Sequence, residues 1–212
     1  EAVPLGASTF LQWCTSTSRA IVVDEVYESF AAQLSETVSR MTVGNGLSSD
    51  TDMGPVCGSE QYESILSAID AAKRSTARLL VGGNPGPGAP GGYFIEPTIF
   101  ADVDPDSSLA QEEIFGPVLS LIRVKSFEEA VAVANDVRYG LCSSVFTRDL
   151  SKALRFTEET DVGLTHVNLM TALKDPQFTF GGRKESGFGI PEAGKTGIEF
   201  FSQHKVAYLR YR

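Results

Sequence analysis

The 212-residue sequence lacks long apolar runs and has few cysteines and histidines. No apolar run approaches the roughly 18 residues that a transmembrane helix needs, so we expect no membrane partner. Cysteine occurs only at Cys14, Cys57 and Cys142, and histidine only twice, with no Cys-x-x-Cys pair. This argues against a disulfide framework and against a structural zinc site, so no metal is predicted. An odd, widely spaced set of thiols favours a reducing compartment, and we expect a cytoplasmic protein.

Positive charge is also scarce. The chain carries 18 basic and 27 acidic residues, a net charge of −9, and its Lys and Arg residues are scattered. Phosphate backbones are bound by basic patches, so we expect no nucleic-acid partner. The sequence begins with Glu1 and shows no signal-peptide pattern, which is consistent with a fragment or a processed product.

One cysteine stands among small hydroxyl residues near the start, in Gln12-Trp13-Cys14-Thr15-Ser16-Thr17-Ser18-Arg19. This stretch fits either the start of a helix or a tight loop. At a helix N-terminus, backbone N–H groups and the helix dipole would stabilise a thiolate at Cys14. The alternative is that Cys14 is a small buried hydrophobe, and this stretch alone leaves both interpretations open.

Strand-like and helix-like segments alternate along the rest of the chain, which predicts an α/β fold with a mostly parallel, twisted sheet and helices on both faces. Strands are expected at 19–23, 77–81, 118–124, 141–146 and 163–167, and an extended segment interrupted by Pro97 at 93–100. Helices are expected near 24–38, 59–69, 107–112, 127–135, 150–159 and 196–203. Residues 171–194 form a long glycine-rich loop. The alternating run from Lys205 to Tyr211 predicts a C-terminal oligomerisation strand that pairs with another sheet or subunit.

A second focus is the run Gln111-Glu112-Glu113-Ile114-Phe115-Gly116-Pro117-Val118. Its carboxylates could bind sugar hydroxyls while the aromatic face of Phe115 packs on a flat ring. Alternatively, Glu112 and Glu113 are exposed helix-end acids and Phe115 is a core residue. The chain has no Gly-x-Ser-x-Gly elbow and no complete Gly-x-Gly-x-x-Gly fingerprint, so neither an α/β-hydrolase nor an ordinary dinucleotide-binding unit is predicted.

The ordered combination of short motifs resembles the C-terminal half of the NAD(P)-dependent aldehyde dehydrogenase superfamily, over essentially the whole chain. The motifs are Gln12-x-Cys14, Thr17-Ser18-Arg19, Gly54-Pro55, Gly92-Tyr93-Phe94-Ile95-Glu96-Pro97-Thr98, Glu112-Glu113-Ile114-Phe115-Gly116-Pro117-Val118, Asn135, Tyr139-Gly140-Leu141, Gly163, Val167-Asn168 and Phe180-Gly181-Gly182-x-Lys184-x-Ser186-Gly187. The resemblance implies a catalytic domain over 1–195, a helix and oligomerisation strand over 196–212, and a cofactor-binding domain that is absent from this chain.

The same resemblance implies roles around the cysteine and the cofactor. Cys14 would be the nucleophile, which forms a thiohemiacetal and then a thioester with the aldehyde. The cofactor, NAD or NADP, would contact Glu113 through its nicotinamide ribose and Phe115 through its nicotinamide. Gln61 falls where the family often has a cofactor-reaching glutamine, but the lysine common three residues later is Ser64 here.

Substrate contacts are implied for Trp13 and Thr15, which flank the nucleophile, and for Phe180, which matches an aromatic of the aldehyde tunnel. Lys174 lies in the same loop as Phe180 and could pair with a substrate carboxylate, although it could equally point into solvent. An acid semialdehyde is therefore the expected substrate class, and the expected partners are a small-molecule aldehyde and further copies of the chain, as a dimer or tetramer.

Three departures limit the resemblance. The cofactor domain, the general-base glutamate and the oxyanion-hole asparagine have no match in this chain, so the chain by itself is expected to be inactive. Leu11 replaces the usual glycine and Ser16 a common alanine, which could tighten or displace the turn around Cys14. Two other functions stay open: a non-catalytic, oligomerising remnant of the family, and a cofactor-independent thiol acyl-hydrolase, which would need His166 or His204 beside Cys14.

Overall fold

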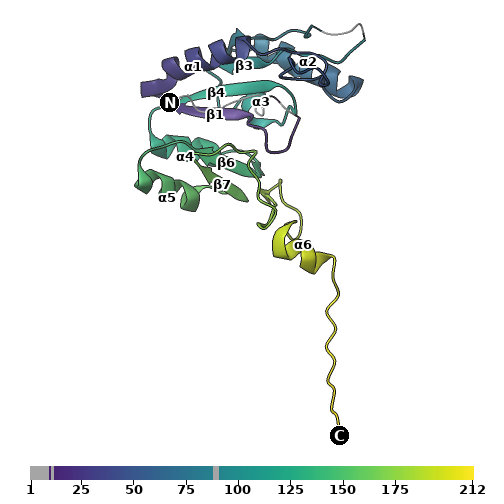
Figure 1. Ribbon diagram of the computed structural model, residues 1–212. Helices are drawn as coiled ribbons and strands as arrows, with labels where there is room; N and C mark the ends of the chain where they lie inside the picture. Colours follow the sequence, from purple (N-terminus) through teal and green to yellow (C-terminus); the bar gives the residue numbers. More distant parts are fainter. Residues whose placement is uncertain (1–9, 11, 88–90) are drawn as a thin grey trace.

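The computed structural model describes residues 10, 12–87 and 91–212, and the elements alternate as an α/β protein should (Figure 1). In chain order they are β1 (Arg19–Val23), α1 (Asp24–Ser39), α2 (Ser59–Lys73), β2 (Arg78–Val81), β3 (Thr98–Ala101), α3 (Ser108–Gln111), β4 (Val118–Val124), α4 (Phe127–Asn135), β5 (Tyr139–Gly140), β6 (Cys142–Val145), α5 (Leu150–Glu159), β7 (Leu164–Val167), β8 (Arg183–Lys184) and α6 (Gly194–Phe200).

The main sheet has four strands in the order β1-β4-β3-β2. The pairings β1–β4 and β3–β4 are parallel, whereas β2 runs antiparallel at the edge. The parallel pair β6–β7 and the antiparallel pair β5–β8 form separate two-stranded sheets. The predicted α/β class with a mostly parallel sheet is therefore confirmed, although the strands divide among three sheets.

Helices cover both faces of the main sheet. Successive side chains of β4 point to opposite faces, and apolar ones on both faces are buried against helices. One face buries Val118, Ile122 and Val124 with α2 and α3, while the other buries Leu119 and Leu121 with α1. Figure 1 shows α1 on one side of β1 and β4 and α4 on the other, with α5, β6 and β7 beyond α4. None of the helices in the described part of the chain is long and apolar enough to cross a bilayer.

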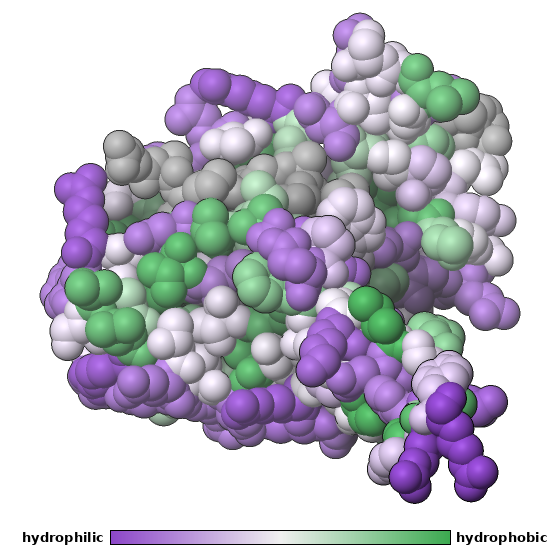
Figure 2. Space-filling view, turned by 60° about the horizontal axis from the view of Figure 1, so that its bottom comes forward, coloured by the Kyte–Doolittle hydropathy of each residue, from purple (hydrophilic) through white to green (hydrophobic). Residues whose placement is uncertain are grey.

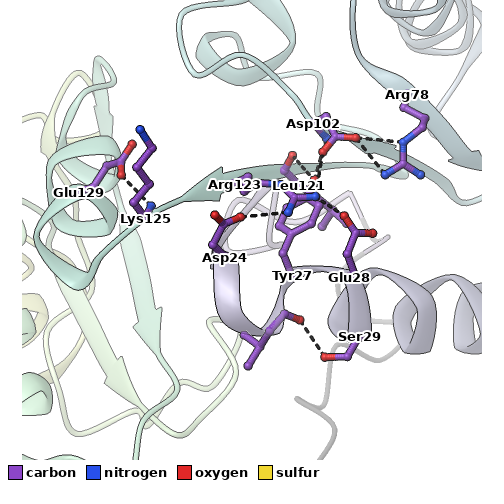
Figure 3. Close-up of polar contacts among 11 residues, drawn as sticks. Asp24, Tyr27, Glu28, Ser29, Arg78, Asp102, Leu121, Arg123, Lys125 and Glu129 are labelled. Atoms are coloured by element: carbon purple, nitrogen blue, oxygen red, sulfur yellow. Dashed lines mark hydrogen bonds and ion pairs between the residues drawn. The ribbon is translucent and has the colours of Figure 1, made fainter.

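Tyr27 of α1 links this helix to the sheet through its hydroxyl group (Figure 3). The side chain is fully buried, and its hydroxyl accepts a 2.7 Å hydrogen bond from the Asp102 N–H and donates to the Leu121 carbonyl at 3.4 Å. Burial raises the pKa of this hydroxyl. The Arg123 guanidinium lies 3.8 Å from the ring centroid, and hydrogen bonds to Glu28 and then Asp24 raise the pKa of that guanidinium.

Replacing Tyr27 with phenylalanine should lower the free energy of unfolding by about 1–2 kcal/mol, because the Asp102 N–H loses its acceptor. Urea denaturation followed by circular dichroism measures this change. The exposed Tyr208→Phe variant is the control and should leave the midpoint unchanged. A Tyr27→Phe protein as stable as the unsubstituted one would contradict the role given to this hydroxyl.

The C-terminal segment differs from expectation. The last helix, α6, begins at Gly194 rather than at 196, and residues 202–212 form neither helix nor strand. In Figure 1 this segment extends away from the body of the chain. An edge strand needs a partner to complete its hydrogen bonds, and within the described part of the chain no strand pairs with the run from Lys205 to Tyr211. Its pairing with another copy stays a prediction.

Candidate active site

Cys14 lies in a tight turn rather than at the start of a helix. The Ser16 N–H donates to the Trp13 carbonyl at 3.0 Å, and the chain enters β1 at Arg19 without forming a helix. Cys14 is exposed. The prediction that Cys14 lies at a helix N-terminus and the alternative that it is a small buried hydrophobic residue are therefore both wrong. Leu11, the departure next to the Gln12-x-Cys14 motif, lies outside the described residues.

A cavity of about 750 Å³ brings the first group of candidate residues together. Trp13 and Cys14 line it from the turn, and Glu113 and Phe115 line it from the segment between α3 and β4. Trp13 is 56% exposed and Phe115 is 41% exposed, so neither is a core residue. An exposed thiol thus shares one cavity with an exposed carboxylate and an exposed aromatic ring, which suits nucleophilic chemistry beside a bound ribose and a flat ring.

Gln61 contacts the backbone of the segment that carries Glu113 and Phe115. Its side-chain amide donates to the carbonyls of Ile114 at 2.9 Å and of Phe115 at 3.2 Å. The amide nitrogen is therefore engaged with the segment that carries Glu113 and Phe115, and Gln61 is not among the residues lining the cavity.

Thr15 is tied to the long loop after β7. The Thr171 hydroxyl donates to the Thr15 carbonyl at 2.7 Å and lies 3.1 Å from the Thr17 hydroxyl. Thr171 lines the cavity, whereas Thr15 does not. The sequence analysis missed Thr171, because a threonine inside a long loop has no pattern that assigns it a partner.

Lys174 and Phe180 lie next to each other but outside the lining of the cavity. The Lys174 ammonium is 4.4 Å from the centroid of the Phe180 ring, within the range of a cation–π contact. Lys174 is exposed. The loop therefore presents a cation and an aromatic ring together, and Thr171 connects the same loop to the cysteine turn.

His166 is a structural residue. Its two ring nitrogens lie 3.2 Å from the Ser143 carbonyl and 3.1 Å from the Leu173 carbonyl. His166 is absent from the cavity lining, and His204 lies in the exposed segment after α6. The histidine beside Cys14 that the acyl-hydrolase hypothesis needs is therefore missing among the described residues.

Cys142 of β6 is a second thiol that lines the cavity. Burial, with a smaller contribution from nearby Cys14, raises the pKa of the Cys142 thiol to about 12. Its sulfur lies 4.0 Å from the Thr15 carbonyl oxygen. A thiol in this environment is protonated and inert at neutral pH.

Iodoacetamide at pH 8 should therefore alkylate Cys142 about a thousandfold more slowly than a thiol of ordinary pKa, because so little of it is thiolate. The raised pKa also means that the free energy of unfolding should fall as the pH rises above the ordinary value of 9. Peptide mass spectrometry measures the labelling, and exposed Cys57 is the internal control. Equal labelling of Cys57 and Cys142 in the folded protein would refute the protected thiol.

The residues at this cavity also fit part of a nicotinamide cofactor. A carboxylate that is free to accept hydrogen bonds suits ribose hydroxyls, and an exposed ring suits a planar heterocycle. Glu113 and Phe115 supply these two groups on one segment, facing the cavity that holds Cys14.

Comparison with known proteins places the chain among aldehyde dehydrogenases. A model of the aldehyde dehydrogenase family matches residues 8–207. The alpha-ketoglutaric semialdehyde dehydrogenase of Bacillus subtilis is 39% identical over 99% of this chain and 44% of its own length. The alpha-ketoglutarate semialdehyde dehydrogenase of Haloferax volcanii is 42% identical over 97% of this chain and 43% of its own length.

Solved structures agree. The aldehyde dehydrogenase of Mycobacterium tuberculosis, crystallised with NAD⁺, superposes with a TM-score of 0.89 at 35% identity, over 95% of this chain and 42% of that one. The chain thus spans less than half the length of the relatives that it matches. Since the family model covers nearly the whole sequence and the fold agrees with solved members, the chain belongs to the aldehyde dehydrogenase family.

Proposed function

We propose that the chain is the catalytic and oligomerisation half of an NAD(P)-dependent enzyme that oxidises an acid semialdehyde to a carboxylic acid. The observation that carries the proposal is the exposed Cys14 thiol, which shares a cavity with Glu113 and Phe115. The catalytic domain occupies 1–195 and the oligomerisation segment 196–212. The chain length, about two fifths of the relatives' length, supports a cofactor-binding domain supplied from elsewhere in a longer protein.

In this proposal Cys14 is the catalytic nucleophile. Its thiolate attacks the aldehyde carbon to form a thiohemiacetal, and the Cys14 N–H stabilises the oxygen that gains negative charge. Oxidation of the thiohemiacetal leaves a thioester on Cys14. Water then attacks the thioester carbonyl, which releases the carboxylic acid and returns the thiol. Trp13 is the side chain that forms a wall of the pocket beside the reacting carbon.

Glu113 and Phe115 would hold the nicotinamide end of the cofactor, through the ribose hydroxyls and the ring respectively. When bound, NAD(P) supplies the acceptor for the hydride that leaves the thiohemiacetal. Gln61 contributes by holding the segment on which both residues stand, through its hydrogen bonds to the carbonyls of Ile114 and Phe115.

The proposed substrate carries a carboxylate. Two relatives that match almost all of this chain are named for alpha-ketoglutaric (or alpha-ketoglutarate) semialdehyde. The pair formed by Lys174 and Phe180 supports the same class, because a positive charge held against an aromatic ring can receive a carboxylate while the ring packs on the carbon chain. Thr15 holds this loop close to the nucleophile, since its carbonyl accepts the Thr171 hydroxyl.

The test compares two aldehydes in the full-length protein, meaning the longest natural form that contains these residues. Lys174→Met should raise the KM for alpha-ketoglutaric semialdehyde about tenfold, the effect of losing one charged hydrogen bond. The KM for pentanal, which has the same carbon count and no acid, should stay within about twofold because pentanal forms no such bond. Lys195→Met, a change at an exposed lysine of α6, is the control. An equal effect on both aldehydes would contradict the carboxylate contact.

The 212-residue chain by itself should not reduce NAD in the presence of aldehyde, because it has no match for the general base, the oxyanion-hole asparagine or the cofactor domain. Turnover of the isolated chain at the rate of a complete enzyme would overturn this part of the proposal. The alternative hypothesis, a non-catalytic remnant of the family, predicts that the full-length protein also oxidises no aldehyde.

We also propose self-association through the C-terminal segment, giving a dimer or tetramer. Phe200, Phe201, Val206 and Leu209 are exposed apolar residues of α6 and the segment after it. Figure 2 shows that the apolar side chains on the viewed face lie in several groups separated by polar ones. An extended segment with exposed backbone and apolar side chains is suited to pairing with a second copy.

A further inference from the structure

Gln12 precedes the nucleophile by two residues, and its side chain joins the cysteine turn to two other segments. Its carbonyl oxygen accepts a 2.6 Å hydrogen bond from the Cys57 N–H. Its amide nitrogen donates to the Phe115 carbonyl at 3.1 Å. These partners are 45 and 103 residues away along the chain, so both contacts depend on the folded structure.

The Phe115 peptide is a strained point that needs such contacts. Phe115 has a φ of +52°, in the left-handed region that costs a bulky residue of order 1 kcal/mol or more. Its carbonyl accepts both the Gln12 and the Gln61 amides, at 3.1 and 3.2 Å, which uses both lone pairs. The next residue, Gly116, packs so closely on Ile65 of α2 that an added Cβ would lie 2.5 Å from the Ile65 side chain.

We propose that Gln12 is a positioning residue, which fixes the Cys14 thiol relative to the face that carries Glu113 and Phe115. The inference rests on the proposed function, in which the nucleophile and the nicotinamide must meet at one carbon. Thr171 holds the other side of the same turn through the Thr15 carbonyl, so the turn is clamped on both sides of Cys14. Displacing a reacting group by about 1 Å can cost on the order of a hundredfold in rate.

Only a residue with one acceptor and one donor at its end can make both contacts. Gln12→Glu keeps an acceptor for the Cys57 N–H but places a carboxylate against the Phe115 carbonyl. Gln12→Met keeps the length of the side chain and loses both contacts. The two variants therefore separate the tie to Cys57 from the tie to Phe115. Gln33→Met, at an exposed position of α1, is the matched control.

The experiment measures steady-state kinetics and amide hydrogen exchange in the full-length protein. In Gln12→Met and Gln12→Glu, kcat for the semialdehyde should fall about ten- to a hundredfold while its KM changes less than about threefold, because positioning is lost and binding is not. Exchange at the Cys57 amide should accelerate about tenfold in Gln12→Met and not in Gln12→Glu, since only the first loses the acceptor. Gln33→Met should behave as the unsubstituted protein.

Each outcome bears on the proposal. An unchanged kcat in both variants, or equal changes of kcat and KM, would overturn the positioning role. Unchanged exchange at Cys57 in Gln12→Met would overturn the clamp itself. A full-length protein that oxidises no aldehyde, yet shows the expected exchange pattern, would instead refute the proposed function and leave the clamp as a structural feature.

Discussion

Replacing Cys14 with serine should lower kcat for aldehyde oxidation in the full-length protein by about 10⁴-fold or more, the range seen when a covalent nucleophile is removed. A serine hydroxyl is scarcely ionised at neutral pH, and His166 is not available to deprotonate it, because both of its ring nitrogens are engaged with the carbonyls of Ser143 and Leu173. The ester formed on serine would also be hydrolysed more slowly than a thioester. Spectrophotometry of the reduced cofactor measures the loss.

Two other thiols provide matched controls for this substitution. Cys57→Ser alters an exposed cysteine whose backbone N–H, not its thiol, makes the contact to Gln12. Cys142→Ser alters the buried thiol whose pKa is raised and which lines the same cavity. Both variants should retain activity within about threefold, since neither thiol takes part in the covalent chemistry. A Cys14→Ser enzyme with a tenth of the original activity or more would show that another group is the nucleophile.

Gly163→Ala should be the most destabilising single methyl addition in the described part of the chain. A Cβ at Gly163 would lie 1.7 Å from the Gly181 carbonyl oxygen, and the Gly163 N–H donates to the Gly140 carbonyl at 3.0 Å. Three backbone segments therefore meet without space for a side chain. Because the obstacle is backbone, relief requires moving the loop that carries Phe180, at a cost of about 3 kcal/mol.

Differential scanning calorimetry should show a fall in Tm of about 10 °C for Gly163→Ala. Gly46→Ala is the control, because an added Cβ there has nothing within 4 Å. Its Tm should remain within about 2 °C of the original. A Tm of Gly163→Ala equal to that of Gly46→Ala would contradict the close approach of the three segments.

The sequence predicted elements best where one pattern decides the structure. The limits of β4, α4 and α5 were predicted to the residue, because a β-branched apolar run, or an apolar helical period with a cap, ends sharply there. Asp149 illustrates this, since its side chain accepts from the N–H groups of Ser151 and Lys152 at the start of α5. The helix expected near 24–38 is α1, but which of its side chains are buried depends on packing: Tyr27 is fully buried, and the neighbouring Val26 is half-exposed.

Partners distant in sequence were not predictable from local patterns. The antiparallel direction of β2 and the separate β6–β7 pair depend on how the elements pack. At the site, Cys14, Glu113 and Phe115 came from motifs, and the structure brings them to one cavity. The hydrogen bonds of Gln12 and Thr171 bridge long sequence separations, and nothing in the neighbouring residues indicates them.

Trapping the acyl intermediate tests the central claim most directly. The full-length protein is mixed with NAD(P) and alpha-ketoglutaric semialdehyde, quenched in acid during turnover, digested and analysed by mass spectrometry. The proposal predicts a thioester-linked acyl group on the peptide that contains Cys14, released by hydroxylamine and absent in Cys14→Ser. Turnover with the acyl group on another residue, or persisting in Cys14→Ser, would contradict it.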